Sequence, residues 1–276
     1  MRSLHRMPIS ALLGLLLTGL FVVVALLAPW IAPFSNAEVV GDVWAAASTK
    51  HWLGTDNLGR DLLSRMIYGT RVTLVIASLA TVLAFTMGSV LGFTAAVVGG
   101  WLDQWLSRGV DLLMAIPTLI FALVVLSVLP STITVLVLVM GTLDATRVYR
   151  LARAVAVDIN VMDFVEAAKL RGEKTRWIVF SEILPNALTP LVSELGLRFI
   201  FAVLFLSALS FLGLGVQPPD ADWGGMVKEN KEGIVFGIPA ALIPAAAIAV
   251  LTISVNLVAD WVLTRTSDLK GGRGNG

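Results

Sequence analysis

The chain has 276 residues, of which 57% are hydrophobic and 14% are charged, with a formal net charge of +1. A soluble domain normally carries about 25% charged residues, so this composition indicates a membrane protein, and the small net charge argues against a nucleic-acid partner, which would require a basic excess on one face. The absence of cysteine excludes disulfide frameworks, thiolate nucleophiles and cysteine-based zinc sites, and two histidines are a poor inventory for catalysis.

Six apolar segments are long enough to span a bilayer, since a spanning helix needs about 20 apolar residues. Only Pro130 and Ser131 separate the third segment from the fourth, which predicts a tight turn between antiparallel neighbours. Prolines within the segments, such as Pro117, are tolerated in membrane helices. We therefore predict an all-α membrane protein with six transmembrane helices, at Ile9–Ala32, Val72–Val98, Val110–Leu129, Thr132–Val148, Leu188–Gly213 and Ile238–Leu263.

The first apolar run is interpreted as a retained anchor helix rather than a signal peptide. It is longer than a signal h-region of about 7–15 residues, and no clean small-residue cleavage site directly follows it. The predicted organisation is an N-terminus with an anchor helix at residues 1–33, an extracytoplasmic segment at 34–71, a five-helix core at 72–264 and a tail at 265–276.

Orientation follows from the positions of Lys and Arg. If the N-terminus is inside, the flanks on its side of the membrane carry the majority of these residues. Cytoplasmic loops are enriched in Lys and Arg. Both termini of the predicted multi-pass protein are therefore expected in the cytoplasm, together with the charged segment 158–186.

The extracytoplasmic segment ends in four closely spaced charges, Asp56, Arg60, Asp61 and Arg65. Asp56 and Arg60, and likewise Asp61 and Arg65, have the i,i+4 spacing that allows pairing on a helix. One interpretation is an amphipathic helix along the membrane surface with solvated charges. The other is a surface that meets a partner outside the membrane.

Five ionisable residues lie in or near the predicted spans. Such residues are functional candidates by default. Structural pairing is the favoured interpretation. Glu194 and Arg198 are one helical turn apart, and each of the three aspartates has an arginine close to it in sequence (Arg108, Arg147 or Arg265). The alternative is a proton relay. The five residues are Asp111, Asp144, Glu194, Arg198 and Asp260.

The segment 158–186 is amphipathic and predicts two short helices around a glycine. Val161, Phe164, Val165 and Ala168 have the spacing of one apolar helix face. Gly172 is placed where a helix would end in a left-handed cap. A second helix can start near residue 175.

The second helix of this segment is followed by Pro185, which disfavours helical geometry at Leu184 and can open the next span from its first turn. Spacing alone leaves two roles open for the whole segment. It can dock into a partner's groove, as amphipathic helices do, or it can rest on lipid headgroups.

The loop after the fifth span, residues 213–225, contains two prolines and Trp223. Its Gly-x-Gly sequence is no nucleotide fingerprint, because no βαβ context is present. We expect the loop to cap the fifth helix and to place Trp223 at the membrane interface.

Residues 166–185 resemble the EAA loop of permease subunits in binding-protein-dependent ABC importers. The matching positions are Glu166, Ala167, Ala168, Gly172, Ile183, Leu184 and Pro185. Residues 51–71 and 210–227 are similar to the dipeptide, oligopeptide and nickel branch of that family. This chain departs from the pattern where Glu173 and Lys174 follow the loop glycine.

The resemblance implies the type I permease fold and a subunit that is not itself an enzyme. The loop would form a coupling helix seated on a cytoplasmic ATPase. The implied coupling residues are Phe164, Val165, Glu166, Ala167, Ala168, Arg171, Gly172, Ile183, Leu184 and Pro185. Of these, Phe164, Val165 and Ala168 would pack inside the partner's groove. The periplasmic face would include Asp56, Arg60, Asp61, Arg65 and Trp223.

The implied partners are a second homologous permease subunit, two ATPase subunits, a periplasmic solute-binding protein and membrane lipid. This chain would bind no cofactor and no metal, with ATP and Mg²⁺ held by the ATPases. The residues agree, because Glu173 interrupts the Gly-Lys-Thr sequence at 172–175 and no glycine lies at the upstream position of a phosphate loop.

The resemblance places the protein in a bacterial inner membrane as a subunit that imports di- or oligopeptides or a related small solute such as a nickel chelate. The alternative is a proton-coupled secondary transporter that uses Asp111, Asp144 or Asp260. That alternative predicts an inverted repeat and broken helices near the middle of the membrane.

Overall fold

The computed structural model describes residues 7–271, and for residues 266–271 only the backbone. Over this range the regular structure is helical, and two isolated bridges involve residues 39, 55, 60 and 61. The helices are α1 (Ile9–Ile31), α2 (Leu62–Val98), α3 (Gly100–Ala115), α4 (Thr118–Val128), α5 (Ile133–Asn160), α6 (Asp163–Leu170), α7 (Thr175–Trp177), a π-helical stretch (Ile178–Ile183), α8 (Leu184–Phe211), α9 (Trp223–Asn230), two 3-10 turns (Lys231–Phe236 and Pro239–Ala241) and α10 (Leu242–Gly271). The all-α prediction is confirmed.

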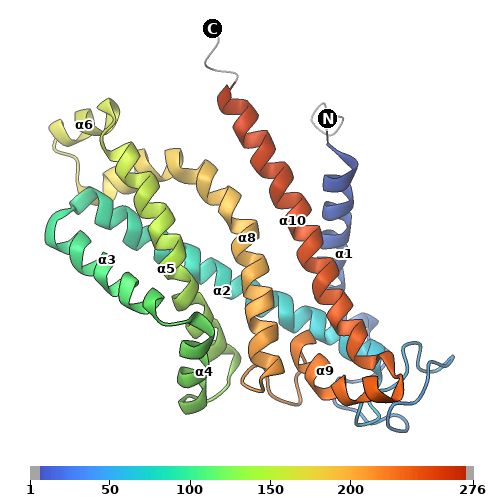
Figure 1. Cartoon of the computed structure of the whole chain (residues 1–276). Coiled ribbons are helices and arrows are strands. Elements are labelled where there is room, and N and C mark those ends of the chain that lie inside the picture. Colours follow the sequence, from blue (N-terminus) through green and yellow to red (C-terminus); the bar gives the residue numbers. More distant parts are fainter. Residues whose placement is uncertain (1–6, 272–276) are drawn as a thin grey trace.

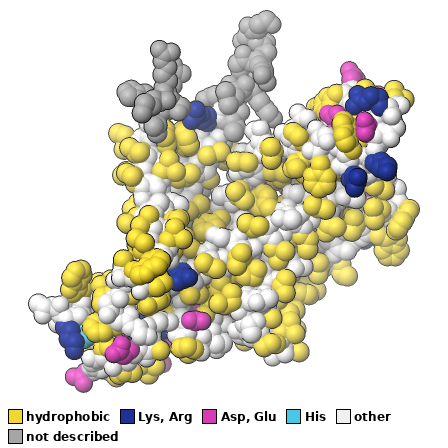
Figure 2. Space-filling view, turned by 180° about the vertical axis from the view of Figure 1, so that it is seen from behind, with side chains coloured by type: hydrophobic (Ala, Val, Ile, Leu, Met, Phe, Trp, Pro, Cys, Tyr) yellow, Lys and Arg dark blue, Asp and Glu magenta, His cyan; other side chains and the backbone are white. Residues whose placement is uncertain are grey.

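The long helices form an elongated bundle. Helix α2 runs obliquely behind α5, α8 and α10 and joins the two ends of the molecule (Figure 1). The start of α1, the end of α10 and α6 lie at one end, whereas α9 and the loop after α1 lie at the other. Hydrophobic side chains cover the middle of the face seen in Figure 2, and charged side chains gather toward two opposite corners.

The predicted count of six single spans is not confirmed. Within residues 7–271, four helices are long and apolar enough to cross a membrane: Ile9–Ile31, Leu62–Val98, Thr175–Phe211 and Pro239–Arg265. The pair α3 and α4 adds a fifth if it is counted as one broken span. Helix α5, at the fourth predicted position, is long but carries several charged residues.

The third predicted span, residues 110–129, is wrong as a single helix. Helices α3 and α4 meet at an angle of 88°. Ile116 is extended, with φ −90° and ψ 131°, as expected before Pro117. Helix α3 is also tied to α5, because Arg153 Nε and Nη2 donate to the two carboxylate oxygens of Asp103 at 2.5 and 2.6 Å.

Two helices begin earlier than predicted. Helix α2 starts at Leu62 rather than Val72, with the Asp61 carboxylate accepting from Ser64 N at 2.8 Å as an N-cap. Residues 62–71 therefore belong to a membrane helix. Helical structure runs from Thr175 to Phe211, and Leu184 stays helical before Pro185. The predicted loss of helical geometry at Leu184 is wrong, whereas Pro185 does lie in the first turn of α8.

Two glycines allow α2 and α5 to approach closely. A Cβ atom on Gly88 would lie 2.7 Å from Ala145 O, and one on Gly92 would lie 2.8 Å from Tyr149 O. Small residues four apart are the usual means by which membrane helices bring their backbones together. The α2–α5 contact therefore depends on the absence of side chains at these two positions.

Replacing Gly92 with valine is expected to separate α2 from α5. Overpacking a close contact typically costs about 1–3 kcal/mol, and the obstacle here is backbone that cannot rotate away. Thermal unfolding of the purified protein in detergent should show a lower midpoint. The control is Gly19→Val in α1, where an added Cβ atom meets nothing within 4 Å. Equal midpoints for the two variants would contradict the packing argument.

Candidate docking segment and ionic cluster

Residues 158–186, here called the docking segment, fold as predicted around Gly172. The glycine has φ +82°, in the left-handed region. Its N–H donates to Lys169 O at 3.0 Å, and Glu173 N–H donates to Ala168 O at 3.2 Å. These two bonds form a Schellman motif, which ends α6 and turns the chain sharply. The second helical stretch then starts at Thr175, as predicted.

The inner face of α6 packs on the rest of the chain. Val165 and Ala168 are fully buried in a cluster with Ile178, Val179 and Ile183. The expectation that Val165 and Ala168 pack inside a partner's groove is therefore wrong for this structure. Their side chains instead hold α6 against the π-helical stretch and α5.

The outer face of α6 is exposed and mixed in character. Glu166, Ala167 and Arg171 are exposed, and Phe164 is 39% exposed. Arg171 is loosely held, with its Nε 4.0 Å from a Glu173 carboxylate oxygen and its guanidinium 5.7 Å from the centre of the Trp177 ring. Of the remaining predicted residues, Pro185 is exposed, Leu184 is half-buried and Ile183 is buried.

Two exposed apolar residues, Leu170 and Met162, were not predicted from the sequence, and a third, Val161, was placed on the wrong face. Leu170 is 85% exposed, and Val161 and Met162 are also exposed beside Phe164. Val161 was assigned to the same face as Val165, but it precedes α6 and its side chain points away from the core. The sequence did contain one signal for the exposed position of Leu170, because this apolar residue comes immediately before the turn at Arg171 and Gly172.

At the opposite end of the molecule, four charged residues form what is here called the ionic cluster: Asp56, Arg60, Arg65 and Glu229. Arg60 donates to Asp56 Oδ2 at 2.7 Å and to Glu229 Oε2 at 2.8 Å. Arg65 contacts the same two carboxylates, with 2.5 Å to Glu229 Oε2. Asp56, Arg60 and Arg65 are buried, so the predicted solvated amphipathic helix is wrong.

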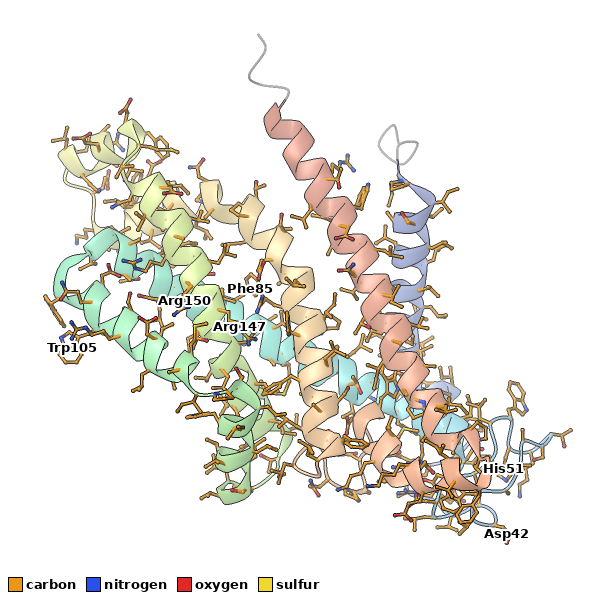
Figure 3. All side chains as sticks on the ribbon, viewed as in Figure 1. Asp42, His51, Phe85, Trp105, Arg147 and Arg150 are labelled. Carbon is orange, nitrogen blue, oxygen red and sulfur yellow. The ribbon has the colours of Figure 1, made fainter. Side chains whose placement is uncertain are left out.

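The predicted pair of Asp56 with Arg60 is present, but a side-chain pair of Asp61 with Arg65 is not formed. Asp61 instead caps α2 and lies 2.9 Å from His51 Nδ1. His51 lies in the loop between α1 and α2, at this end of the molecule (Figure 3). Glu229 was missed because it is 169 residues from Arg60 in sequence, beyond the reach of any local spacing rule.

Trp223, expected at the membrane interface, is fully buried. Its ring packs edge-on against Phe21, with centroids 5.4 Å apart, and closely approaches Gly69. Its Nε1 donates to Met66 O at 3.4 Å. Trp223 therefore fixes α9 to α1 and α2 and is not available to a partner in this structure.

Asp222, the N-cap of α9, is completely buried. Its Oδ2 accepts from Gly224 N at 3.0 Å, and the Ser210 hydroxyl and the Gly225 N–H lie close enough to the carboxylate to lower its pKa in part. Burial raises the pKa of Asp222 from 3.8 to about 6. Above that pH the folded protein holds a buried carboxylate at a cost in stability.

Asp222→Asn is expected to stabilise the fold at about pH 8 by as much as about 3 kcal/mol. Asparagine keeps the N-cap acceptor and cannot ionise. The folded pKa is raised, so the wild-type protein gains protons and stability as the pH falls from about 6 to about 4. The gap in unfolding midpoint between wild type and variant should close over that interval. A gap independent of pH would contradict this account.

Comparison with known proteins gives the family. The family model of the inner membrane component of binding-protein-dependent transport systems matches residues 88–268. The chain belongs to this family. This permease is 32% identical over 251 residues to the dipeptide transport system permease protein DppC of Alkalihalophilus pseudofirmus, covering 91% of this chain and 83% of that protein.

Further relatives extend the comparison. The di/tripeptide transport system permease protein DppC of Pseudomonas aeruginosa is 34% identical over 258 residues, covering 91% of this permease and 85% of that protein. The glutathione transport system permease protein GsiD of Pectobacterium atrosepticum is 30% identical over 262 residues, covering 94% and 86%. The permease is therefore a multi-pass membrane subunit of an ABC importer. It is not itself an enzyme, and the family implies partner ATPases and a solute-binding protein.

Four of the five charged residues in or near the spans of the permease are ion-paired as predicted, whereas no ion pair between Asp260 and Arg265 is formed among the described residues. Arg198 and Glu194 are 2.6 Å apart on α8. Asp111 pairs with Arg150 of α5 at 2.6 Å rather than with an arginine of its own helix. Asp260 accepts from Asn256 Nδ2 at 3.2 Å.

Proposed function

We propose that this permease is one of two non-identical transmembrane subunits of an importer for di- and oligopeptides. The relatives named above carry dipeptide, di/tripeptide and glutathione in their names, which supports a short peptide as the cargo. The supporting structural observation is the docking segment, a sharply turned and packed projection at one end of the bundle (Figure 1).

In this proposal the exposed face of α6 seats on a partner ATPase. Phe164 and Leu170 supply apolar contacts, and Glu166 and Arg171 pair with charges at the rim of the groove. Val165, Ala168 and Ile183 transmit the movement, because they are packed into the helices that the ATPase must move. Two ATPase subunits would bind ATP and Mg²⁺ and would close together on the two permeases.

The proposed orientation puts α6, the start of α1 and the end of α10 in the cytoplasm of a bacterial cell. The opposite end, with the ionic cluster and α9, then faces the periplasm and meets the solute-binding protein. Exposed residues there, such as Trp52 and Leu58, are better placed for direct contact than the buried charges.

Uptake by purified complexes in lipid vesicles tests the proposal. We expect accumulation of labelled alanyl-alanine that requires ATP, the ATPases, the sister permease and the binding protein. Uptake by this permease alone, driven by a proton gradient, would instead establish the secondary transporter. A complex that accumulates other solutes in the presence of ATP, but no peptide, would refute short peptides as the cargo and would leave the ATP-driven importer unchallenged.

A further inference from the structure

A cavity of about 210 Å³ lies between α2, α4, α5 and α8. Most of its lining is apolar and includes Phe201 and Phe205 of α8, but Asp144 and Arg147 of α5 also line it. Asp144 follows the first residue of α5 by eleven positions, about 16 Å along the helix axis. The charged part of the cavity is therefore near the middle of α5 rather than at either end of the helix.

Asp144 and Arg147 belong to a group of four charges with Glu194 and Arg198 of α8. Arg198 bridges two carboxylates, because its guanidinium donates to Glu194 Oε1 at 2.6 Å and to Asp144 Oδ1 at 3.2 Å. Its side chain is only 10% exposed. Arg198 and Glu194 therefore form the structural part of the group and hold α8 against α5.

Arg147 and Asp144, in contrast, retain unused hydrogen-bonding capacity. Arg147 Nη1 is 3.5 Å from Asp144 Oδ1, well beyond the 2.7–2.9 Å of a charge-assisted hydrogen bond. The Arg147 side chain is 38% exposed, and its guanidinium lies 5.4 Å from the centre of the Phe201 ring. Figure 3 shows Arg147 between α5 and α8. Asp144 Oδ2 is buried and has no partner among the described residues.

This arrangement differs from that of a purely structural ion pair. A buried carboxylate oxygen without a partner is uncommon and requires an explanation, and ionisable residues within transmembrane segments are candidates for the path of a transported solute. The four side chains carry two positive and two negative charges. A solute of zero net charge with both signs would leave the group balanced, whereas an ion of one sign would not.

We propose that this cavity is a contact site for the zwitterionic ends of the cargo during its passage. The cargo's ammonium group would pair with the Asp144 carboxylate, and its carboxylate would accept from Arg147. This inference rests on the proposed function, because it assumes that short peptides are transported. The cavity is smaller than the pockets of about 300–1,000 Å³ that enclose whole ligands, so it takes a very small peptide or one part of a longer one.

The lack of cysteine in this chain allows a direct test. A single cysteine is introduced by Thr118→Cys in the cavity wall, and the complex without its binding protein is treated with a maleimide that labels this residue. We expect alanyl-alanine to slow labelling in a saturable manner. The end-blocked analogue, N-acetyl-alanyl-alanine amide, should not slow it.

The same measurement is then made with Arg147→Gln or Asp144→Asn added. Each change removes one charge-assisted hydrogen bond, so the peptide concentration for half-protection should rise about tenfold or more. The matched control is Arg150→Gln, also on α5, whose ion pair with Asp111 is exposed. It should leave protection unchanged. Recovery of each complex by gel filtration shows that it is folded and assembled.

The outcomes separate the two proposals. Absence of protection, equal protection by the end-blocked analogue, or protection that survives both Arg147→Gln and Asp144→Asn would overturn the contact site. ATP-dependent uptake of alanyl-alanine without protection would leave the importer intact and remove only this site. Protection without uptake in the complete system would show that the cavity binds a peptide that is not carried, and would overturn both the short-peptide cargo and the role of the site in passage. A variant that does not assemble is replaced by Arg147→Lys, which keeps the charge but loses the planar donor pair and should weaken protection.

Discussion

Gly172→Pro is expected to disconnect the permease from its ATPases. Proline locks φ near −65°, whereas Gly172 has φ +82°, and it removes the N–H that donates to Lys169 O. The Schellman motif cannot form, so the exposed face of α6 loses its fixed position. Co-purification of the ATPases should fall by about tenfold or more, equivalent to about 1.4 kcal/mol of binding free energy.

The matched control is Gly172→Asn, because asparagine tolerates the left-handed conformation better than other side chains. An added Cβ atom at this position meets nothing within 4 Å. Gly172→Asn should therefore keep most of the ATPase association. Membrane insertion should be the same for both variants. An intact complex with Gly172→Pro would contradict docking through this segment.

Asp56→Asn is expected to destabilise the end of the molecule that carries the ionic cluster. The Asp56 carboxylate is the shared partner of Arg60 and Arg65, both buried. Breaking a buried ion pair from one side typically costs about 3–5 kcal/mol, because it leaves an uncompensated charge. Glu229 then balances only one of two guanidinium groups. The unfolding midpoint in detergent should fall strongly, and a protease should cut residues 40–60 faster.

The control is Asp42→Asn, an exposed position at the same end of the molecule (Figure 3). Surface changes of this kind usually stay within about 0.5 kcal/mol of the wild type. Asp56→Asn combined with Arg65→Met removes one charge of each sign, so it should recover part of the lost stability. A single Asp56→Asn change with no effect on the midpoint would show that the cluster is hydrated and contributes little.

The docking segment was predictable because its structure is local. The helix, its end at Gly172 and the new start at Thr175 follow from residues within about ten positions of one another. The sequence pattern could not say which side of α6 faces the protein. Phe164 and Val165 are adjacent apolar residues, and only the contacts of Val165 with Ile178 and Ile183 bury one and leave the other exposed.

Only part of the ionic cluster could be predicted, because one of its carboxylates comes from a distant part of the sequence. The i,i+4 spacing of Asp56 and Arg60 is local, but Glu229 reaches Arg60 and Arg65 only once α9 packs beside α2. The bend at Pro117 was missed because membrane helices often accommodate proline. In this protein Ile116 takes the extended conformation that the ring of the following Pro117 favours. A salt bridge from Asp103 to Arg153 also draws α3 toward α5.

Helix α2 has a consequence for how motion passes through the permease. It continues for 37 residues without a break, about 56 Å. Arg65, near its first turn, belongs to the ionic cluster, and Phe93, near its last, packs in the cluster that supports the docking segment. Because α2 is held by contacts near both of its ends, a tilt of one end also moves the other end. Any contact made at the ionic cluster is thus linked through one helix to the packing beneath the docking segment.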